Sequence, residues 1–327
     1  MSAPWLLGIE IGGTKLQLGI GNDDGQISAL AERTIVPAAG AAGIRAQIEE
    51  AYRELRTKTR IDHVAAAGIG FGGPVDPERG LVLVSNQIEG WNGFPICDWV
   101  AQSLEIDTVV LQNDSDTATL AEYRYGAGRG VSPLLYVNSG SGVGGGLVVN
   151  GQIYAGSGLG AIEIGHLWIE EEPEPRKLED VASGWAIARA GRERVSEWRN
   201  RDQPTQSLLY SLSDGEPDRV TGEIVARAAM AGDPQALQIF ARATRAMGRA
   251  LAHAVTLIAP RRIVLGGGVA QCPQSLWLDP IRQELDRRVF ASFQGSYDLV
   301  VAELAQKVVV HGALALAAQA CGRPPAS

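Results

Sequence analysis

The first part of the chain alternates apolar runs with short glycine-rich or Asx turns. An apolar run at 5–11 leads into the turn at 12–15, and a second run at 16–20 leads into the turn at 22–25. Apolar runs of this length, separated by Gly and Asx residues, are typical of β-hairpins. We therefore predict β-hairpins at the start of the chain, with a further strand entered at about residue 26.

The same order of runs and turns recurs from residue 133 onward. An apolar run at 134–137 enters the glycine-rich stretch 139–146. A second run at 147–149 is followed by the tight Asn150-Gly151 turn. The sequence therefore contains two copies of one hairpin pattern.

The correspondence continues beyond the hairpins. Strand-like runs end in glycines at 65–73 in the first copy and at 262–268 in the second. A later strand then precedes helical sequence in each copy, at 108–111 and at 299–304, the second helix following Gly312. Chance could explain one recurring glycine hairpin, but an ordered set favours duplication. We predict two similar α/β lobes with a cleft between them.

The region before residue 262 is predicted to be mostly helical. Apolar residues recur at helical spacing over 220–231 and over 234–258. Asp233 separates the two segments and is a predicted N-cap. The segment 203–217 is rich in Ser, Gln, Pro and Asp and is predicted to be a loop.

Composition narrows the class of protein. The 327 residues suffice for two domains at about 150 residues each, and 45% hydrophobic with 20% charged residues is ordinary for a globular chain. A formal net charge of −8 argues against a nucleic-acid-coating surface. No apolar run approaches the roughly 18 residues that span a bilayer, and no signal peptide is predicted. The three cysteines are scattered, which fits the reducing interior of a cell better than a disulfide framework. We expect a cytoplasmic protein.

Two glycine-rich turns are candidates for phosphate binding. At 12–15 the glycines let backbone N–H groups approach an anion, and Thr14 and Lys15 add donors and charge. Either turn alone could be a simple hairpin connection. The stretch 140–146 holds more glycine than a turn requires, although each glycine adds chain entropy that is lost on folding. Together the turns resemble two clamps on one phosphate chain, without the Lys-Ser/Thr pair of a Walker A loop.

Four consecutive polar residues, Asn113-Asp114-Ser115-Asp116, lie between a predicted strand and a helix predicted to start near Thr117. Helix capping explains one such residue and leaves the others to be explained. A carboxylate at the end of a strand, facing the predicted cleft, can receive a hydroxyl proton. Aspartate is a weak base, with a reference pKa of about 3.9, but loose phosphoryl-transfer transition states need little early deprotonation. Asp114 is therefore the candidate general base.

Other polar residues could bind the hydroxyl groups of a sugar. Glu163 and His166 follow the second hairpin, Glu179 lies further on, and Asn86 and Asn92 lie in a turn-rich stretch. Carboxylate, amide and imidazole groups can each bind paired hydroxyls. Structural interpretations stay open for all five: a surface acid, a histidine at the edge of a core, a helix N-terminal acid, and loop caps.

Taken together, these segments resemble the ROK family of bacterial sugar kinases and sugar-responsive repressors, over about residues 6 to 320. The segments that carry the resemblance are 7–15, Gly72-Gly73-Pro74-Val75-Asp76, Asn86 through Trp91-Asn92, Asn113-Asp114, 140–146, Glu163-x-Gly-His166, Leu178-Glu179 and 265–269. The resemblance implies an actin/hexokinase-type (ribonuclease H-like) duplicated α/β fold, two-lobed, with an interlobe active-site cleft.

The resemblance also implies boundaries for the two lobes. The smaller N-terminal lobe would comprise 1–117 and about 305–327, and the larger C-terminal lobe would comprise 118–304. The final helix, around 312–320, would return to pack on the first lobe.

Roles for individual residues follow from the same resemblance. Asp114 would be the catalytic base. The implied substrate-binding residues are Gly73, Asn86, Asn92, Asn113, Asp114, Glu163, His166 and Glu179. The implied nucleotide-binding residues are Gly12, Gly13, Thr14, Lys15, Gly140, Ser141, Gly142, Gly144, Gly267 and Gly268. Glu10 stands where most members have Asp and is expected to hold Mg²⁺ through water.

The largest departure from the family lies between His166 and Glu179. Zinc-binding members place several cysteines there, whereas the intervening residues of this chain include none. Tetrahedral structural zinc needs four Cys or His-type ligands, so we predict no structural zinc. Arg176 and Lys177 are expected to pair with the acidic residues before them and to hold the loop.

The leading hypothesis is a sugar kinase that transfers the γ-phosphoryl group of ATP, with Mg²⁺, to a hexose hydroxyl, first the 6-hydroxyl of glucose. A polyphosphate-dependent glucokinase, an N-acetylhexosamine kinase and a fructokinase are alternatives within the same chemistry. A non-catalytic sugar-sensing regulator is an alternative of another class. Its DNA-binding form is disfavoured by the charge of −8 and by a first strand that begins by Trp5. A homo-oligomer, often a dimer in the family, is also expected.

Overall fold

The computed structural model describes residues 4–85, 88–157, 160–170, 173–201 and 206–322. The chain divides into two compact units. The first unit comprises Met1–Tyr136, Gly146–Ile162 and Glu303–Ser327, and the second comprises Val137–Gly145 and Glu163–Ala302. The lobe boundaries that the resemblance implies stay a prediction.

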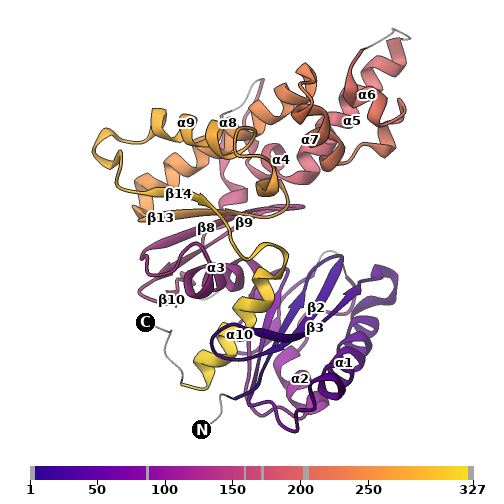
Figure 1. Cartoon of the computed structure of the whole chain (residues 1–327), viewed down its shortest axis with the longest axis vertical. Coiled ribbons are helices and arrows are strands. Elements are labelled where there is room, and N and C mark those ends of the chain that lie inside the picture. Colours follow the sequence, from indigo (N-terminus) through magenta and orange to yellow (C-terminus); the bar gives the residue numbers. More distant parts are fainter. Residues whose placement is uncertain (1–3, 86–87, 158–159, 171–172, 202–205, 323–327) are drawn as a thin grey trace. The chain divides into compact units, whose positions relative to one another are not determined.

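A five-stranded sheet forms the centre of the first unit (Figure 1), with the strand order β3-β2-β1-β4-β7. Its strands are β1 (Leu6–Ile11), β2 (Lys15–Gly21), β3 (Ile27–Thr34), β4 (Ala66–Phe71) and β7 (Val109–Asn113). The three N-terminal strands pair antiparallel, whereas β1, β4 and β7 run parallel. The predicted hairpins are therefore confirmed.

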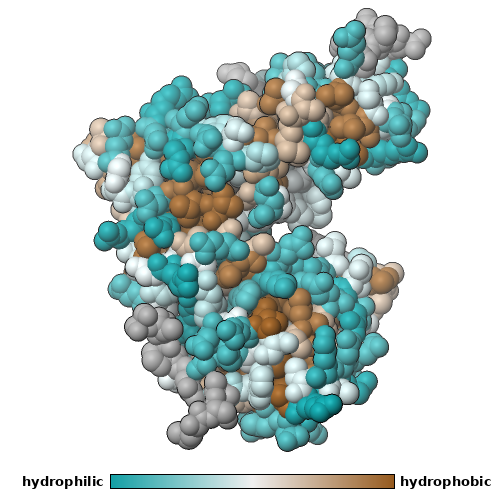
Figure 2. Space-filling view, viewed as in Figure 1, coloured by the Kyte–Doolittle hydropathy of each residue, from teal (hydrophilic) through white to brown (hydrophobic). Residues whose placement is uncertain are grey.

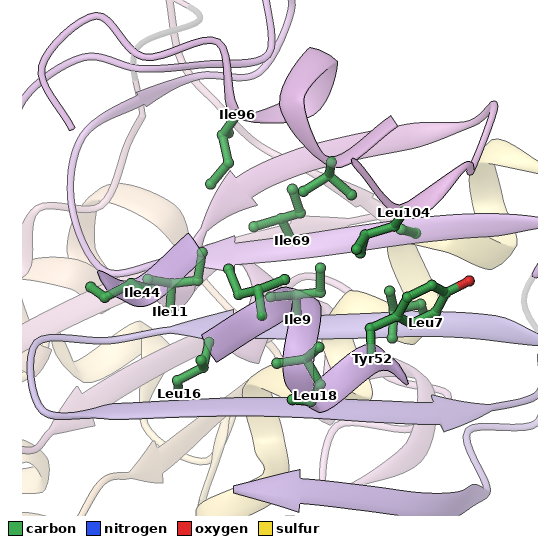
Figure 3. Close-up of a cluster of buried hydrophobic side chains, with 14 of the residues drawn as sticks. Leu7, Ile9, Ile11, Leu16, Leu18, Ile44, Tyr52, Ile69, Ile96 and Leu104 are labelled. Atoms are coloured by element: carbon green, nitrogen blue, oxygen red, sulfur yellow. The ribbon is translucent and has the colours of Figure 1, made fainter. Parts of the chain in front are cut away.

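Apolar side chains cover both faces of this sheet. Side chains alternate along a strand, so Leu7, Ile9 and Ile11 point into one core while Leu6 contributes to another. Figure 3 shows the first core, where the strands meet Ile44 of α1. The helices and short strands of the unit are η1 (Pro37–Ala39), α1 (Gly40–Thr59), β5 (Val75–Asp76), β6 (Leu81–Val82), α2 (Ile96–Leu104), α3 (Asp114–Tyr125), η6 (Ala305–Lys307) and α10 (Val308–Ala320).

The final helix, α10, packs on the first unit, as the resemblance implied. Leu314, Ala317 and Ala318 of α10 share a core with Leu6 of β1. A Cβ on Gly312 would overlap the carbonyl oxygen of Thr117, so glycine is what allows α10 to approach α3 this closely. The helix begins at Val308, earlier than the sequence predicted.

A buried carboxylate fixes the chain where it enters α10. Glu122 of α3 is fully buried. Its Oε1 accepts a hydrogen bond from the Leu304 N–H at 2.9 Å, and its Oε2 accepts one from the Ala127 N–H at 2.8 Å. Backbone donors to a buried carboxylate replace the hydration that burial removes. Glu122 therefore ties the segment before α10 to α3.

The second sheet repeats the first, with the strand order β10-β9-β8-β13-β14. Its strands are β8 (Leu134–Ser139), β9 (Val143–Val149), β10 (Gln152–Ile153), β13 (Arg262–Gly266) and β14 (Asp298–Val301). As in the first sheet, the strands at one edge pair antiparallel and those at the other edge pair parallel. The predicted duplication is confirmed, although β14 ends at Val301 and not at Leu304. Strands β8 and β9 are each divided between the two units.

Helices make up most of the second unit. Its elements are η2 (Ile164–His166), β11 (Trp168–Ile169), β12 (Arg176–Lys177), α4 (Glu179–Ala182), α5 (Gly184–Arg201), α6 (Leu208–Leu212), η3 (Pro217–Arg219), α7 (Gly222–Met230), α8 (Pro234–Ile258), η4 (Val269–Gln271), α9 (Leu278–Arg288) and η5 (Ala291–Phe293). The predicted helices at 220–231 and 234–258 are confirmed. Asp233 caps α8, accepting N–H bonds from Gln235 and Ala236 at 2.9 Å each.

The predicted loop at 203–217 is wrong in part, because it contains α6. The buried side chain of Leu209 anchors this short helix. The second carboxylate oxygen of Asp233 accepts hydrogen bonds from the Ser207 hydroxyl and the Leu209 N–H. A tertiary contact to the α8 cap thus stabilises a helix that its polar sequence did not indicate.

The helices are amphipathic. In α8 the buried residues Phe240, Met247, Leu251 and Val255 recur at helical spacing. Figure 2 shows hydrophilic residues over much of the visible face of each unit, with smaller apolar patches between them. Among the described helices, none is both long and apolar enough to cross a membrane.

Candidate active site

The turn at 12–15 lies at the carboxyl end of β1 and is fixed by backbone hydrogen bonds. The Gly12 N–H donates to the Lys15 carbonyl at 2.9 Å, and the Ile35 N–H donates to the Thr14 carbonyl at 2.9 Å. The Gly72 N–H donates to the Ile11 carbonyl at 2.8 Å, which joins the ends of β1 and β4. The first predicted phosphate turn therefore lies where two parallel strands end.

Lys15 holds a positive charge at this turn. Its Nζ lies 3.1 Å from Glu10 Oε1, and it donates to the Gln306 carbonyl at 2.9 Å and to Gln17 Oε1 at 3.2 Å. Gln306 comes from the segment before α10 and was not found by sequence reasoning. No local signal pointed to it, because the contact joins opposite ends of the chain.

Glu10 is a buried acid with a perturbed pKa. Burial raises its pKa to about 7, and the negative charge of Asp114 adds to this rise, whereas Lys15 opposes it. The second carboxylate oxygen, Oε2, is buried and has no hydrogen-bond partner among the described residues. An orphaned carboxylate oxygen fits a hydrogen bond from a Mg²⁺-bound water, since Mg²⁺ keeps several waters. This buried oxygen fits the role that the resemblance implies for Glu10, and that role stays a prediction.

Asn113 places the next residue, Asp114. Its Oδ1 accepts the Ser115 N–H at 2.8 Å, so Asn113 is the N-cap of α3. Its Nδ2 donates to the Gly73 carbonyl at 3.1 Å. The helix starts at Asp114 and not near Thr117, because the first of the four polar residues, rather than a later one, provides the cap.

The carboxylate of Asp114 lies beside the first turn. A Cβ placed on Gly72 would lie 3.4 Å from Asp114 Oδ2 and 3.4 Å from the Cα of Gly12. Burial is the main cause of the raised pKa of both Glu10 and Tyr136, and the negative charge of Asp114 adds to both rises. The first unit therefore brings together the candidate base, the candidate metal residue and one candidate phosphate turn.

The turn that joins β8 to β9 lies in the second unit and is held by backbone groups of the α4–α5 junction. The Gly184 N–H donates to the Gly140 carbonyl at 2.7 Å, and the Ser139 hydroxyl donates to the Ala182 carbonyl at 2.7 Å. Gly267, with φ 88°, packs against the carbonyl of Ser139, where a Cβ would overlap that oxygen. Sequence reasoning identified Gly140 and Gly267 and missed Gly184 and Ser139.

Val143, the first residue of β9, contacts residues at or next to the predicted sugar-binding positions of the second unit. Its N–H donates to Glu179 Oε2 at 2.9 Å. Gly165 packs against its carbonyl, where a Cβ would overlap the oxygen. Gly165 belongs to η2, which ends at the exposed residue His166 and follows the exposed N-cap residue Glu163. Glu179 therefore contacts the strand that leaves the second phosphate turn, and Glu163 and His166 lie next to the glycine that packs on that strand.

The short hairpin β11–β12 replaces the family's cysteine loop. Arg176 Nη2 lies 3.9 Å from Glu174 Oε1, which confirms the predicted pairing of Arg176 with the acidic run. Lys177 Nζ lies 3.3 Å from His166 Nδ1. Within the described residues no three His, Cys, Asp or Glu side chains lie close enough to hold a metal ion. The lack of a structural zinc stays a prediction.

Among the described residues, no hydrogen bond joins the remaining predicted site residues into a group. Asn92 Oδ1 accepts the Ser85 N–H at 2.9 Å, which is a loop-capping contact, and Asn86 lies outside the described residues. Gly144 lies in β9 and Ser141 is exposed. No described heavy atom lies within 4 Å of a Cβ built on Gly268, so that position faces open space. Ser141 and Gly268 are therefore accessible to a ligand, but their surroundings do not indicate which ligand it is.

The two five-stranded sheets, each with a glycine turn between its first antiparallel strands, define the duplicated α/β fold of hexokinase-type sugar kinases. The family model described as ROK family matches residues 6–320, and the chain belongs to the ROK family.

Individual relatives are similar over almost their whole length. The glucokinase of Thermotoga maritima is 30% identical over 97% of this chain and 98% of its own. The crystal structure of a ROK family glucokinase from Streptomyces griseus in complex with glucose and AMPPNP is 31% identical, has a TM-score of 0.81, and covers 96% of this chain and 99% of its own. The ROK hexokinase of Thermus thermophilus is 25% identical, with a TM-score of 0.76, covering 97% and 99% respectively.

Proposed function

We propose that the chain is an ATP-dependent hexose kinase that phosphorylates glucose, at the 6-hydroxyl. The observation that carries this proposal is the match of fold and sequence, at 31% identity over 96% of the chain, to a glucokinase bound to glucose and AMPPNP. The position of Asp114 also supports the proposal, because this candidate base lies beside the turn at 12–15, the first candidate phosphate turn.

Asp114 would act as the general base. Asn113 fixes its position through the helix cap and the bond to the Gly73 carbonyl. A carboxylate held in this way can accept the proton of a sugar hydroxyl as that oxygen bonds to phosphorus and the bond from phosphorus to the ADP oxygen breaks. Positioning contributes most of the effect, because a loose transition state leaves the proton on the hydroxyl until late.

The nucleotide would be held by glycine-rich turns. The turn at 12–15 and Lys15 would bind phosphates in the first unit, and 140–142 with Gly267 and Gly268 would do so in the second. Mg²⁺, when bound with the nucleotide, would neutralise the negative charge of the phosphates. Glu10 would hold one of its waters through the orphaned Oε2.

The sugar would be held by Asn113, Glu163, His166 and Glu179. Carboxylates accept and imidazole donates or accepts, so the set can bind several hydroxyls in fixed directions. We also propose that the enzyme works in the cytoplasm, where ATP is available, and that it assembles as a homodimer, which light scattering of the purified chain would test.

A coupled assay over a panel of hexoses tests the proposal. Glucose, N-acetylglucosamine, N-acetylmannosamine, mannose and fructose would each be tested with ATP and, separately, with polyphosphate. We expect glucose with ATP to give the highest kcat/KM. Turnover with polyphosphate alone would show that polyphosphate, and not ATP, is the phosphoryl donor. Hexose binding without turnover in the presence of either donor would identify the chain as a sugar-sensing regulator.

A further inference from the structure

The side chain of Glu179 contacts the second phosphate turn directly. Its Oε2 accepts the Val143 N–H at 2.9 Å. A Cβ built on Gly142 would overlap the same oxygen, so the carboxylate fills the space beside this glycine. One oxygen of Glu179 is therefore committed to the backbone at 142–143, whatever the side chain does for a sugar.

Glu179 differs from the other supports of this turn. The bonds from Gly184 to Gly140 and from Ser139 to Ala182 join neutral donors to neutral carbonyl acceptors. The bond from Val143 to Glu179 has a carboxylate as its acceptor, and hydrogen bonds to carboxylates are roughly twice as strong as neutral ones. Glu179 is thus the support whose loss should move the turn most.

We propose that Glu179 is a positioning residue for nucleotide binding, because its carboxylate holds the backbone at Gly142–Val143 in the shape that receives phosphate. The inference rests on the proposed function for the turn and adds a second role to a residue proposed as a sugar contact. Sugar and nucleotide would then depend on the same carboxylate within the second unit.

The sign of the effect separates this role from simple electrostatics. A carboxylate near a bound phosphate repels it, so neutralising Glu179 should strengthen nucleotide binding if charge alone mattered. If Glu179 holds the turn, removing it should weaken nucleotide binding instead. A residue that only contacts sugar should leave nucleotide binding unchanged when no sugar is present.

The first test measures the Kd of Mg·AMPPNP by calorimetry without sugar. Glu179→Ala should raise this Kd on the order of tenfold, as expected for losing one hydrogen bond to a charged group. Glu179→Gln keeps an acceptor oxygen for the Val143 N–H and should recover most of the affinity. An unchanged or lower Kd for Glu179→Ala would overturn the inference.

The second test displaces the Glu179 carboxylate by changing its neighbour, Gly142. Gly142→Ala adds a methyl group that would overlap Glu179 Oε2, so it should weaken nucleotide binding about as much as Glu179→Ala. In the double variant the alanine at 179 leaves room for that methyl group, so the two losses should not add. Gly140→Ala, where the nearest atom would be Asn138 Nδ2 at 3.4 Å, should cause a smaller loss. Fully additive losses would argue against a shared contact.

Two comparators complete the design. Asp180→Asn removes the exposed neighbouring charge on α4 and should change the Kd less than about twofold, far below the tenfold expected for one lost charged hydrogen bond. His166→Ala should raise the KM for sugar while leaving the Kd for Mg·AMPPNP unchanged. Thermal melting of every variant checks that it is folded.

The outcomes separate the inference from the proposed function. If the chain phosphorylates hexose with ATP but Glu179→Ala binds Mg·AMPPNP like the unmodified chain, the inference fails alone. If the unmodified chain binds no nucleotide, the proposed function and the inference both fail.

Discussion

The two glycine turns occupy the same place in the repeat but are held in different ways. The turn at 12–15 contains a charged residue, Lys15. This side chain pairs with Glu10 and donates to the Gln306 carbonyl. The turn at 140–142 contains no charged residue, and Glu179 supports it from outside. The duplicated backbone was therefore kept, while the ionisable groups were placed differently.

This contrast assigns different tasks to the two units. The first unit concentrates titratable groups near its turn, with Asp114 close enough to Glu10 to raise its pKa. The second unit offers a neutral turn flanked by residues suited to hydroxyl groups. Perturbed acids gather at functional sites more often than elsewhere, so we expect the chemistry to depend most on the first unit.

The largest expected effect is that of Asp114→Asn, which removes the candidate base but keeps the size of the side chain. The kcat for hexose phosphorylation should fall by roughly 10²–10⁴, the usual contribution of a general base. Glucose binding, measured by calorimetry, should be largely retained. Asp180→Asn in the second unit is the control and should keep its kcat, whereas near-normal turnover by Asp114→Asn would remove Asp114 from its role.

Glu10→Gln should change how stability depends on pH. A raised folded-state pKa favours folding below the unfolded-state pKa of 4.5, and this advantage is lost as pH rises through about 7. The loss amounts to about 3 kcal/mol of unfolding free energy at 1.36 kcal/mol per pKa unit. Urea unfolding without Mg²⁺ or nucleotide should therefore show Glu10→Gln gaining stability relative to the unmodified chain between pH 4.5 and pH 8. Parallel curves would show that Glu10 titrates normally.

Lys15→Met should weaken nucleotide binding by removing the charge from the first turn. The KM for ATP should rise on the order of tenfold, as for losing one hydrogen bond to a charged group. Lys15→Arg keeps the charge and should lose less. An unchanged KM for ATP in Lys15→Met would mean that the first turn binds phosphate through its backbone alone, like the second.

The smallest effect compares two helix caps, one in each unit. Asn113 caps α3, and Thr221 caps α7 by accepting the Ile224 N–H at 3.2 Å. Replacing either by Ala should lower the unfolding free energy by about 1 kcal/mol. Only Asn113→Ala should also lower kcat, because Asn113 places Asp114. Equal activity in both variants would contradict that assignment.

Local signals were enough to predict the repeat. The hairpins followed from apolar runs between glycine turns, and α8 followed from its periodicity and from Asp233 as a cap. The helix at α6 was missed because its support comes from Asp233, far along the chain. The start of α3 was misplaced because four consecutive residues could each have served as the cap.

The candidate site was predictable as a set of residue types and only partly as a set of contacts. Asp114 and Lys15 could be named as candidates because runs of acidic residues and of glycines in the sequence mark such positions. The partners Gln306 and Gly184 carry no distinctive chemistry of their own, and only the tertiary fold brings them to the turns. The bond from Val143 to Glu179 was hidden for the same reason, since the donor is a backbone group.

The most direct test of the central claim is ³¹P NMR of the purified chain with Mg·ATP and glucose. The account predicts that glucose 6-phosphate and ADP accumulate in equal amounts. Glucose that stays unphosphorylated, with ATP either intact or hydrolysed to free phosphate, would contradict it.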